Sequence, residues 1–141
     1  MYSEKTFEHT VAFLRIALGI VFFWFALLKL VGYNPVYDIV YASFPILADG
    51  IGNLFLGGLE LAIGVGLLCN IFPKTMHAVL ILHLVGTFSV LLTAPQLMYS
   101  PHFPMLTLAG EFVVKNLVLA MSGVVVILYH MRHPRLSKGW W

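Results

Sequence analysis

The stretch VAFLRIALGIVFFWFALLKLV, residues 11–31, decides the fold of this chain. It is apolar except for Arg15 and Lys29, and it is long enough for one helix to cross the hydrocarbon core of a bilayer, which takes about 20 such residues. Signal peptides have a shorter apolar core followed by a small-residue cleavage site, so we expect this stretch to be retained as a membrane span. Three further stretches meet the same criterion: residues 52–71, 75–92 and 105–129.

The composition also favours a membrane protein. Of the 141 residues, 60% are hydrophobic and only 10% are charged, whereas soluble domains carry about 25% charged residues. So few charges cannot cover a water-facing surface, and the sequence therefore predicts one all-α transmembrane domain, a four-helix bundle over residues 1–141. The formal net charge of +2 gives no reason to expect nucleic acid as a partner. Cys69 is the single cysteine, which excludes an intramolecular disulfide and a CxxC redox pair.

The basic residues predict the orientation of the bundle. They lie in the N-terminal segment, in the loop after the second span and in the C-terminal tail, whereas the loops after the first and third spans contain neither Lys nor Arg. The residues concerned are Lys5, Arg15, Lys74, Arg132, Arg135 and Lys138. Because cytoplasmic loops carry the excess of Lys and Arg, we expect both termini on the cytoplasmic side.

Regularly spaced residues on the first two spans predict how the helices pack. One stripe of the first helix repeats at alternating four- and three-residue steps: Arg15, Gly19, Phe22, Ala26 and Lys29. The second span has a stripe of small residues, where another helix can approach closely, next to a face with glycines around an acid. The stripe consists of Gly58, Ala62 and Gly66, and the glycines around Glu60 are Gly57 and Gly64. We interpret these glycines as packing features and not as a site.

Ionisable residues lie inside the predicted spans, where each costs about 2.5–3.5 kcal/mol on insertion scales, so they are expected to face the bundle interior and to pair. They are Arg15 near the inner end and Lys29, Glu60, His83, Glu111 and Lys115 in the outer half. A helical rise of about 1.5 Å per residue places the outer group at similar depths. We predict a closed, nearly neutral network that opens outward, in which Lys29 meets Glu111 and Glu60 meets Lys115. Glu111 and Lys115 are also four residues apart, which favours a pair on one helix.

A purely structural interpretation stays open for the same residues, because the network could simply hold the four helices together. His83, with Thr87 one turn beyond it, fits a hydrogen-bonded core histidine better than a metal or haem ligand, since no partner histidine is evident at its depth. Arg15 could extend to the cytoplasmic interface and keep its guanidinium in water. We expect neither a haem nor a metal site.

Several short motifs resemble DoxX-like membrane proteins. They are Leu14-Arg15-Ile16-Ala17-Leu18-Gly19-Ile20 continuing through Trp24 to Leu28-Lys29, then Gly58-Leu59-Glu60, then Thr87-Phe88-Ser89 through Thr93-Ala94-Pro95, and finally Gly110-Glu111-Phe112 with Lys115-Asn116. The last two are most similar to the branch that contains the inner-membrane protein of the reactive-chlorine resistance system. The resemblance implies a multi-pass protein of the bacterial cytoplasmic (inner) membrane in redox or oxidative-stress physiology. The charged positions that match are Arg15, Lys29, Glu60, Glu111 and Lys115.

Three functions are compatible with these observations. The leading hypothesis is a membrane subunit or accessory factor of a redox pathway that binds a quinone or another small amphipathic molecule, with Glu60, Lys115 and His83 at its head group. The second is a channel or carrier for protons or a small solute. The third is a non-catalytic scaffold whose tail, residues 132–141, docks a soluble partner. We do not expect an independent enzyme, whereas a redox partner, soluble or in the membrane, and a homo-oligomer stay open.

Overall fold

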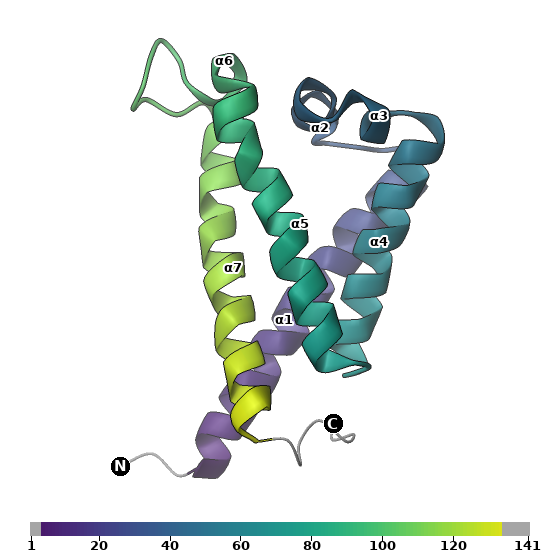
Figure 1. The fold of residues 1–141 in the computed structure, drawn as a ribbon, viewed down its shortest axis with the longest axis vertical. Helices are drawn as coiled ribbons and strands as arrows, with labels where there is room; N and C mark the ends of the chain where they lie inside the picture. Colours follow the sequence, from purple (N-terminus) through teal and green to yellow (C-terminus); the bar gives the residue numbers. More distant parts are fainter. Residues whose placement is uncertain (1–3, 134–141) are drawn as a thin grey trace.

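The computed structural model describes residues 4–133, and four long helices dominate it. They are α1 (Glu4–Leu30), α4 (Gly50–Leu68), α5 (Pro73–Thr93) and α7 (Leu108–Arg132), and Figure 1 shows them side by side. Each is long and apolar enough to cross a membrane. The predicted all-α four-helix membrane bundle is therefore confirmed, and the chain is a multi-pass membrane protein.

The helix ends differ from the predicted spans: α1 extends well beyond its apolar stretch, whereas α4 ends three residues earlier and α7 begins three residues later than predicted. The first helix begins at Glu4, well before the apolar stretch. The last begins at Leu108, where the Thr107 side chain accepts a hydrogen bond from the backbone nitrogen of Gly110 and caps the helix. Such a cap satisfies one of the backbone donors that the first turn of a helix leaves without a partner.

Three short helices lie at one end of the bundle, and the start of α1 and the end of α7 lie at the other (Figure 1). The short helices are α2 (Tyr37–Ser43) and α3 (Pro45–Ala48), which connect α1 to α4, and α6 (Pro95–Met98), which follows α5. Because the described chain crosses the bundle an even number of times, the start of α1 and the end of α7 lie at the same end of the bundle. The assignment of that end to the cytoplasm stays a prediction, and the tail residues Arg135, Lys138 and 140–141 lie outside the described residues.

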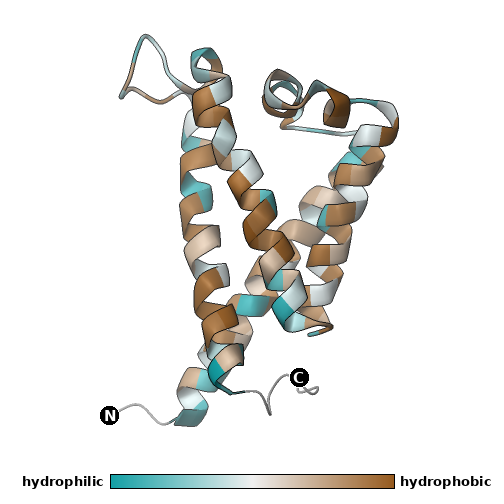
Figure 2. Cartoon of the chain, viewed as in Figure 1, coloured by the Kyte–Doolittle hydropathy of each residue, from teal (hydrophilic) through white to brown (hydrophobic). Residues whose placement is uncertain are grey.

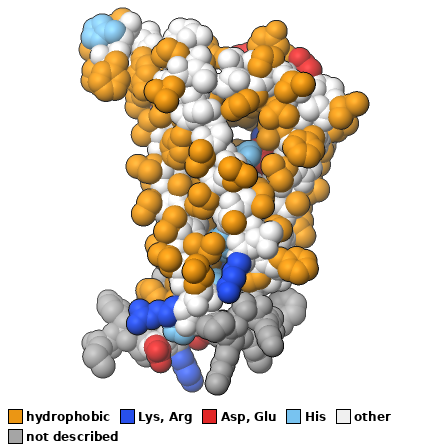
Figure 3. Space-filling view, viewed as in Figure 1, with side chains coloured by type: hydrophobic (Ala, Val, Ile, Leu, Met, Phe, Trp, Pro, Cys, Tyr) orange, Lys and Arg blue, Asp and Glu red, His pale blue; other side chains and the backbone are white. Residues whose placement is uncertain are grey.

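The surface of the bundle is largely apolar, as contact with lipid requires. Hydrophobic residues predominate along the long helices (Figure 2), and many large hydrophobic side chains are exposed, among them Phe13, Leu82, Leu92 and Val118. The Lys and Arg side chains on this face lie near the end where α1 begins and α7 ends, and Asp and Glu side chains are visible at both ends (Figure 3). An apolar belt with charges at its margin is the surface of a membrane-embedded protein.

The helices pack as two closely associated pairs, α1 with α4 and α5 with α7. The closest approach of the first pair is at Gly64, where an added Cβ would lie 2.5 Å from the backbone nitrogen of Phe23. The predicted stripe of small residues is only partly correct. Gly66 does receive another helix, through Met76 of α5, but Gly58 and Ala62 are exposed, and nothing lies within 4 Å of a Cβ added at Gly58. The face next to the stripe, with Gly57, Glu60 and Gly64, is the one that contacts α1.

Candidate functional site

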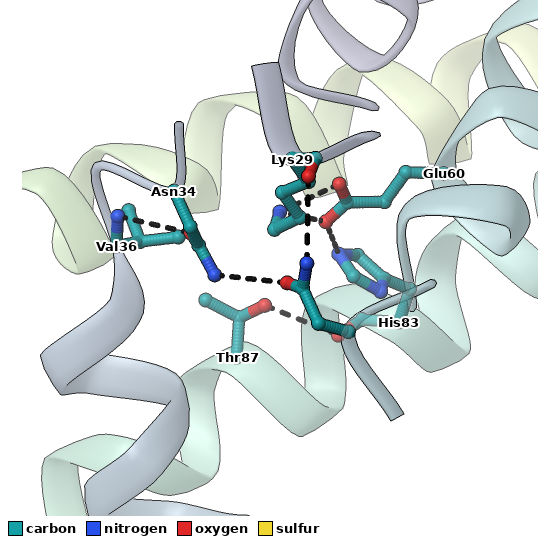
Figure 4. A network of polar contacts seen from close by, with 7 residues as sticks. Lys29, Asn34, Val36, Glu60, His83 and Thr87 are labelled. Atoms are coloured by element: carbon teal, nitrogen blue, oxygen red, sulfur yellow. Dashed lines mark hydrogen bonds and ion pairs between the residues drawn. The ribbon is translucent and has the colours of Figure 1, made fainter. Parts of the chain in front are cut away.

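Three ionisable side chains from three different helices meet inside the half of the bundle that holds the short helices. Lys29 Nζ of α1 donates to both carboxylate oxygens of Glu60 of α4, at 2.7 and 2.6 Å. His83 Nε2 of α5 lies 3.2 Å from Glu60 Oε1. Lys29 and Glu60 are each only 4% exposed. Figure 4 shows the carboxylate between the amine and the imidazole. We call these three residues the polar cluster.

The local sequence explains why the cluster forms. Gly57 and Gly64 lie one turn before and one turn after Glu60, and their missing side chains let α1 come close enough for Lys29 to reach the carboxylate. The stripe predicted on the first span is confirmed, since Arg15, Gly19, Phe22, Ala26 and Lys29 are all buried. An ammonium and a carboxylate that leave water together are favourable only with close geometry of this kind.

Further hydrogen bonds hold the C-terminal end of α1 next to the polar cluster. Asn53 Nδ2 donates to the backbone oxygen of Lys29 at 3.4 Å, and Asn34 Nδ2 donates to Asn53 Oδ1 at 3.2 Å. Asn34 Oδ1 in turn accepts from the backbone nitrogen of Val36 at 3.3 Å, just before α2 (Figure 4). Neither asparagine could be predicted for this role, because Asn34 lies in a connection and Asn53 in the first turn of α4, and only the fold places the two beside the end of α1.

The His83 ring is oriented by groups on two neighbouring helices. Its Nε2 faces Glu60, and the ring contacts Phe22 of α1 edge-on, with ring centroids 5.6 Å apart. Thr87 bonds the backbone oxygen of His83 at 3.2 Å and not its ring. In the described part of the chain, no group hydrogen-bonds His83 Nδ1. The histidine is thus a core residue with one bonded and one free nitrogen.

The cluster lies in the wall of a cavity of about 490 Å³ between the two helix pairs. The rest of the wall is almost entirely apolar, with Asn116 of α7 and Thr87 of α5 as further polar contributors. The segment of α2, α3 and the residues next to them covers the cavity with Val36, Ile39, Val40, Phe44 and Leu47. Figure 3 shows a hollow among hydrophobic side chains, with a histidine at its floor.

Two predicted members of the network lie outside it. Glu111 and Lys115 of α7 are both exposed, and Lys115 Nζ lies over the Phe112 ring, 4.4 Å from its centroid. The predicted pairs of Lys29 with Glu111 and of Glu60 with Lys115 are therefore wrong, since Lys29 and Glu60 pair with each other. The inward face of α7 instead carries Gly110, Val113, Asn116 and Gly123. These residues are three, three and seven positions apart, and this helical spacing was the sequence pattern that could have indicated Asn116.

Arg15 lies at the other end of the bundle and stabilises a helix end. It is buried, and its guanidinium donates to the backbone oxygens of Leu67 and of Leu68, the latter at 3.1 Å. These are carbonyls of the last turn of α4, where a cation is favourable. The predicted extension of Arg15 into water is therefore wrong.

A buried histidine pair near this end was not predicted. His77 of α5 and His130 of α7 have ring centroids 5.9 Å apart. Their Nδ1 atoms bond the backbone oxygens of Pro73 and Val126, four residues earlier in each helix. Among the described residues, no partner bonds His77 Nε2. Residues 4–133 contain no group of three side chains arranged to hold a metal ion.

Comparisons with known proteins leave the family open. No protein-family model, no curated protein and no solved structure matches the chain.

Proposed function

We propose that the chain is a DoxX-like subunit or accessory protein of the bacterial inner membrane that acts in redox or oxidative-stress physiology and binds a quinone or similar amphipathic molecule in the cavity. The observation that carries the proposal is an apolar cavity whose wall holds one compact polar cluster. Small-molecule sites are typically apolar, with a few placed polar groups that orient the ligand. The resemblance of the charged motifs to DoxX-like proteins supplies the physiological context.

The dimensions of the cavity support a ligand of this class. Its volume of about 490 Å³ lies in the range of about 300–1,000 Å³ that is usual for small-molecule sites. The head group of a quinone has polar atoms on an otherwise flat apolar ring, which matches the Lys29, Glu60 and His83 wall. An isoprenoid or alkyl tail requires only the apolar remainder.

The position of the cavity supports access from lipid. Phe55 of α4 and Leu82 of α5 line it, yet 64% of Phe55 and 71% of Leu82 is exposed. Both residues lie on the apolar belt, so the cavity reaches the surface where acyl chains would surround the bundle. The apolar side chains of α2 and α3 separate it from the water at the end of the bundle. A ligand dissolved in the membrane would thus enter sideways, between α4 and α5.

Two glycine variants provide a matched test. Gly86 lines the cavity and Gly58 faces outward, and neither has an atom within 4 Å of an added Cβ. Gly86→Leu therefore fills the cavity without a backbone clash, whereas Gly58→Leu adds the same side chain on the lipid side. The measurement is the thermal stability of the purified protein in nanodiscs with increasing decylubiquinone.

For the wild type and Gly58→Leu, we expect stabilisation that reaches about 2.7 kcal/mol at 100 times the Kd. Gly86→Leu should fold and show no such increase. Decylubiquinone that stabilises none of the three proteins, or all three equally, would contradict the proposal.

A proton carrier is the second candidate, because the imidazole of His83 bonds a buried carboxylate inside a membrane span. Proteoliposomes that hold a pH gradient distinguish the two functions. A leak that Glu60→Gln removes and Gly86→Leu preserves would favour the carrier. The scaffold hypothesis rests on tail residues outside the described range and stays a prediction.

A further inference from the structure

The free nitrogen of His83 determines what kind of head group the cavity accepts, provided that the cavity is the quinone site proposed above. A carboxylate only accepts hydrogen bonds, so Nε2 must carry a proton to bond Glu60 at 3.2 Å. The charge of Glu60 is already balanced by Lys29 at 2.6 Å. In a neutral imidazole whose Nε2 donates, Nδ1 carries a free lone pair and is a hydrogen-bond acceptor.

Asn116 is the second unpartnered polar group of this cavity. Its side chain is only 5% exposed, and it lines the cavity from α7, on a different helix from each member of the polar cluster. No hydrogen bond joins its amide to another side chain or backbone group in residues 4–133. An amide both donates and accepts. A bound molecule that hydrogen-bonds this amide from within the cavity would therefore be stabilised.

We infer that the cavity prefers the reduced, hydroxyl-bearing form of its ligand, a hydroquinone, over the oxidised quinone. A hydroxyl can donate to His83 Nδ1 and, through its oxygen, accept from Asn116 or from the remaining proton of Lys29. A quinone carbonyl only accepts, so it can satisfy the donors of Asn116 and Lys29 but leaves His83 Nδ1 unpaired. Both forms have nearly the same size and the same tail, so the apolar walls contribute little to this preference.

The expected ratio of the two affinities follows from His83 Nδ1, the acceptor that a bound quinone leaves without a hydrogen bond. One buried unsatisfied group corresponds to an affinity ratio of between about fivefold and 150-fold. The chain would then retain reduced quinone and release the oxidised form more readily. The partner class implied by this chemistry is an enzyme that reduces quinone, which supplies the ligand, or one that oxidises quinol, which consumes it.

The test compares the affinities of decylubiquinol and decylubiquinone for the full chain in nanodiscs under nitrogen. The informative variant is His83→Phe, which keeps an aromatic ring against Phe22 and removes both ring nitrogens, the free Nδ1 and the Nε2 that bonds Glu60. His102→Phe makes the same change in the exposed loop and is the matched control. We expect the wild type and His102→Phe to bind quinol at least fivefold more tightly than quinone, and His83→Phe to bind both forms equally.

Asn116→Leu keeps the polar cluster intact and is the second variant. It should weaken both forms but retain a preference for quinol, because His83 Nδ1 is still present. Equal binding of the two forms by the wild type would overturn the inference and leave the quinone site standing. A preference that persists in His83→Phe would also overturn it, since His83 would not be the acceptor. If neither form bound the wild type, the proposed function itself would fail.

Discussion

Removing one charge of the buried pair should cost more stability than removing both. Lys29 and Glu60 are each 4% exposed, and Lys29 Nζ lies 2.7 and 2.6 Å from the two carboxylate oxygens. Glu60→Gln leaves the ammonium buried without a counter-charge, which should lower the free energy of unfolding by about 3–5 kcal/mol. The double variant Lys29→Met with Glu60→Gln removes both charges, and its amide oxygen can still accept from His83. We expect it to lose only about 1 kcal/mol.

The free energy of unfolding can be measured in mixed micelles by titration with sodium dodecyl sulfate, with helix content followed by circular dichroism. Glu111→Gln is the matched control, because it makes the same chemical change at an exposed position of α7. We expect it to stay within about 0.5 kcal/mol of the wild type. The prediction is refuted if the double variant loses as much free energy of unfolding as Lys29→Met and Glu60→Gln lose together. It is also refuted if Glu60→Gln is as stable as Glu111→Gln.

Three further predictions use the same unfolding assay or a simple titration. Gly64→Ala should destabilise by about 1–3 kcal/mol, because its Cβ would meet a backbone nitrogen of α1 at 2.5 Å; Gly58→Ala, with nothing within 4 Å, should change stability by less than about 0.5 kcal/mol. Arg15→Met should cost about 1.5–3 kcal/mol, because two carbonyls at the end of α4 lose a charged donor. Equal stability of wild type and variant would contradict either prediction. The Tyr37 hydroxyl donates to Asp49 at 3.0 Å, which raises the pKa of Tyr37 above its usual 10.0. The contact thus stabilises the fold below pH 10, and this contribution is lost as the pH rises through the folded-state pKa. In an absorbance titration, Asp49→Ala should lower that pKa, and an unchanged pKa would count against the contact.

The spans could be predicted because the requirement for a membrane helix is local. Lipid offers no hydrogen bonds to the backbone, so a sufficiently long apolar stretch must be helical. The stripe on the first helix could be predicted for a similar reason. Arg15 and Lys29 are costly in lipid, and the residues that share their spacing had to face inward with them.

The partners of the charged residues could not be predicted, because residue depth alone does not fix how a helix is rotated. The predicted depths of Lys29, Glu60, Glu111 and Lys115 were similar, so depth did not distinguish one pairing of acid and base from another. The structure pairs Lys29 with Glu60, since the glycines around Glu60 bring α1 close and a lysine side chain is long and flexible. On α7, the stripe that contains Asn116 turns inward, and this rotation exposes Glu111 and Lys115.

The predicted network also had too many members, because charged residues such as Lys115 are tolerated on the surface of the bundle. Lys115 lies over the Phe112 ring, at 4.4 Å from the ring centroid, where a cation is favourable, and long side chains near the membrane boundary can extend toward water. An ionisable residue in a predicted span therefore need not belong to an internal network. His77 and His130 could not be predicted as a buried pair. Their Nδ1 atoms bond backbone oxygens of their own helices, so no spacing pattern in the sequence links the two residues.

Photoaffinity labelling with an azide-bearing quinone analogue in nanodiscs, followed by peptide mapping, locates the ligand most directly. A quinone bound at the polar cluster should label residues that line the cavity, such as Leu59, His83 and Asn116, and excess decylubiquinol should suppress this labelling. Labelling confined to lipid-facing residues such as Leu108 and Leu128, and insensitive to competitor, would contradict a quinone site in the cavity.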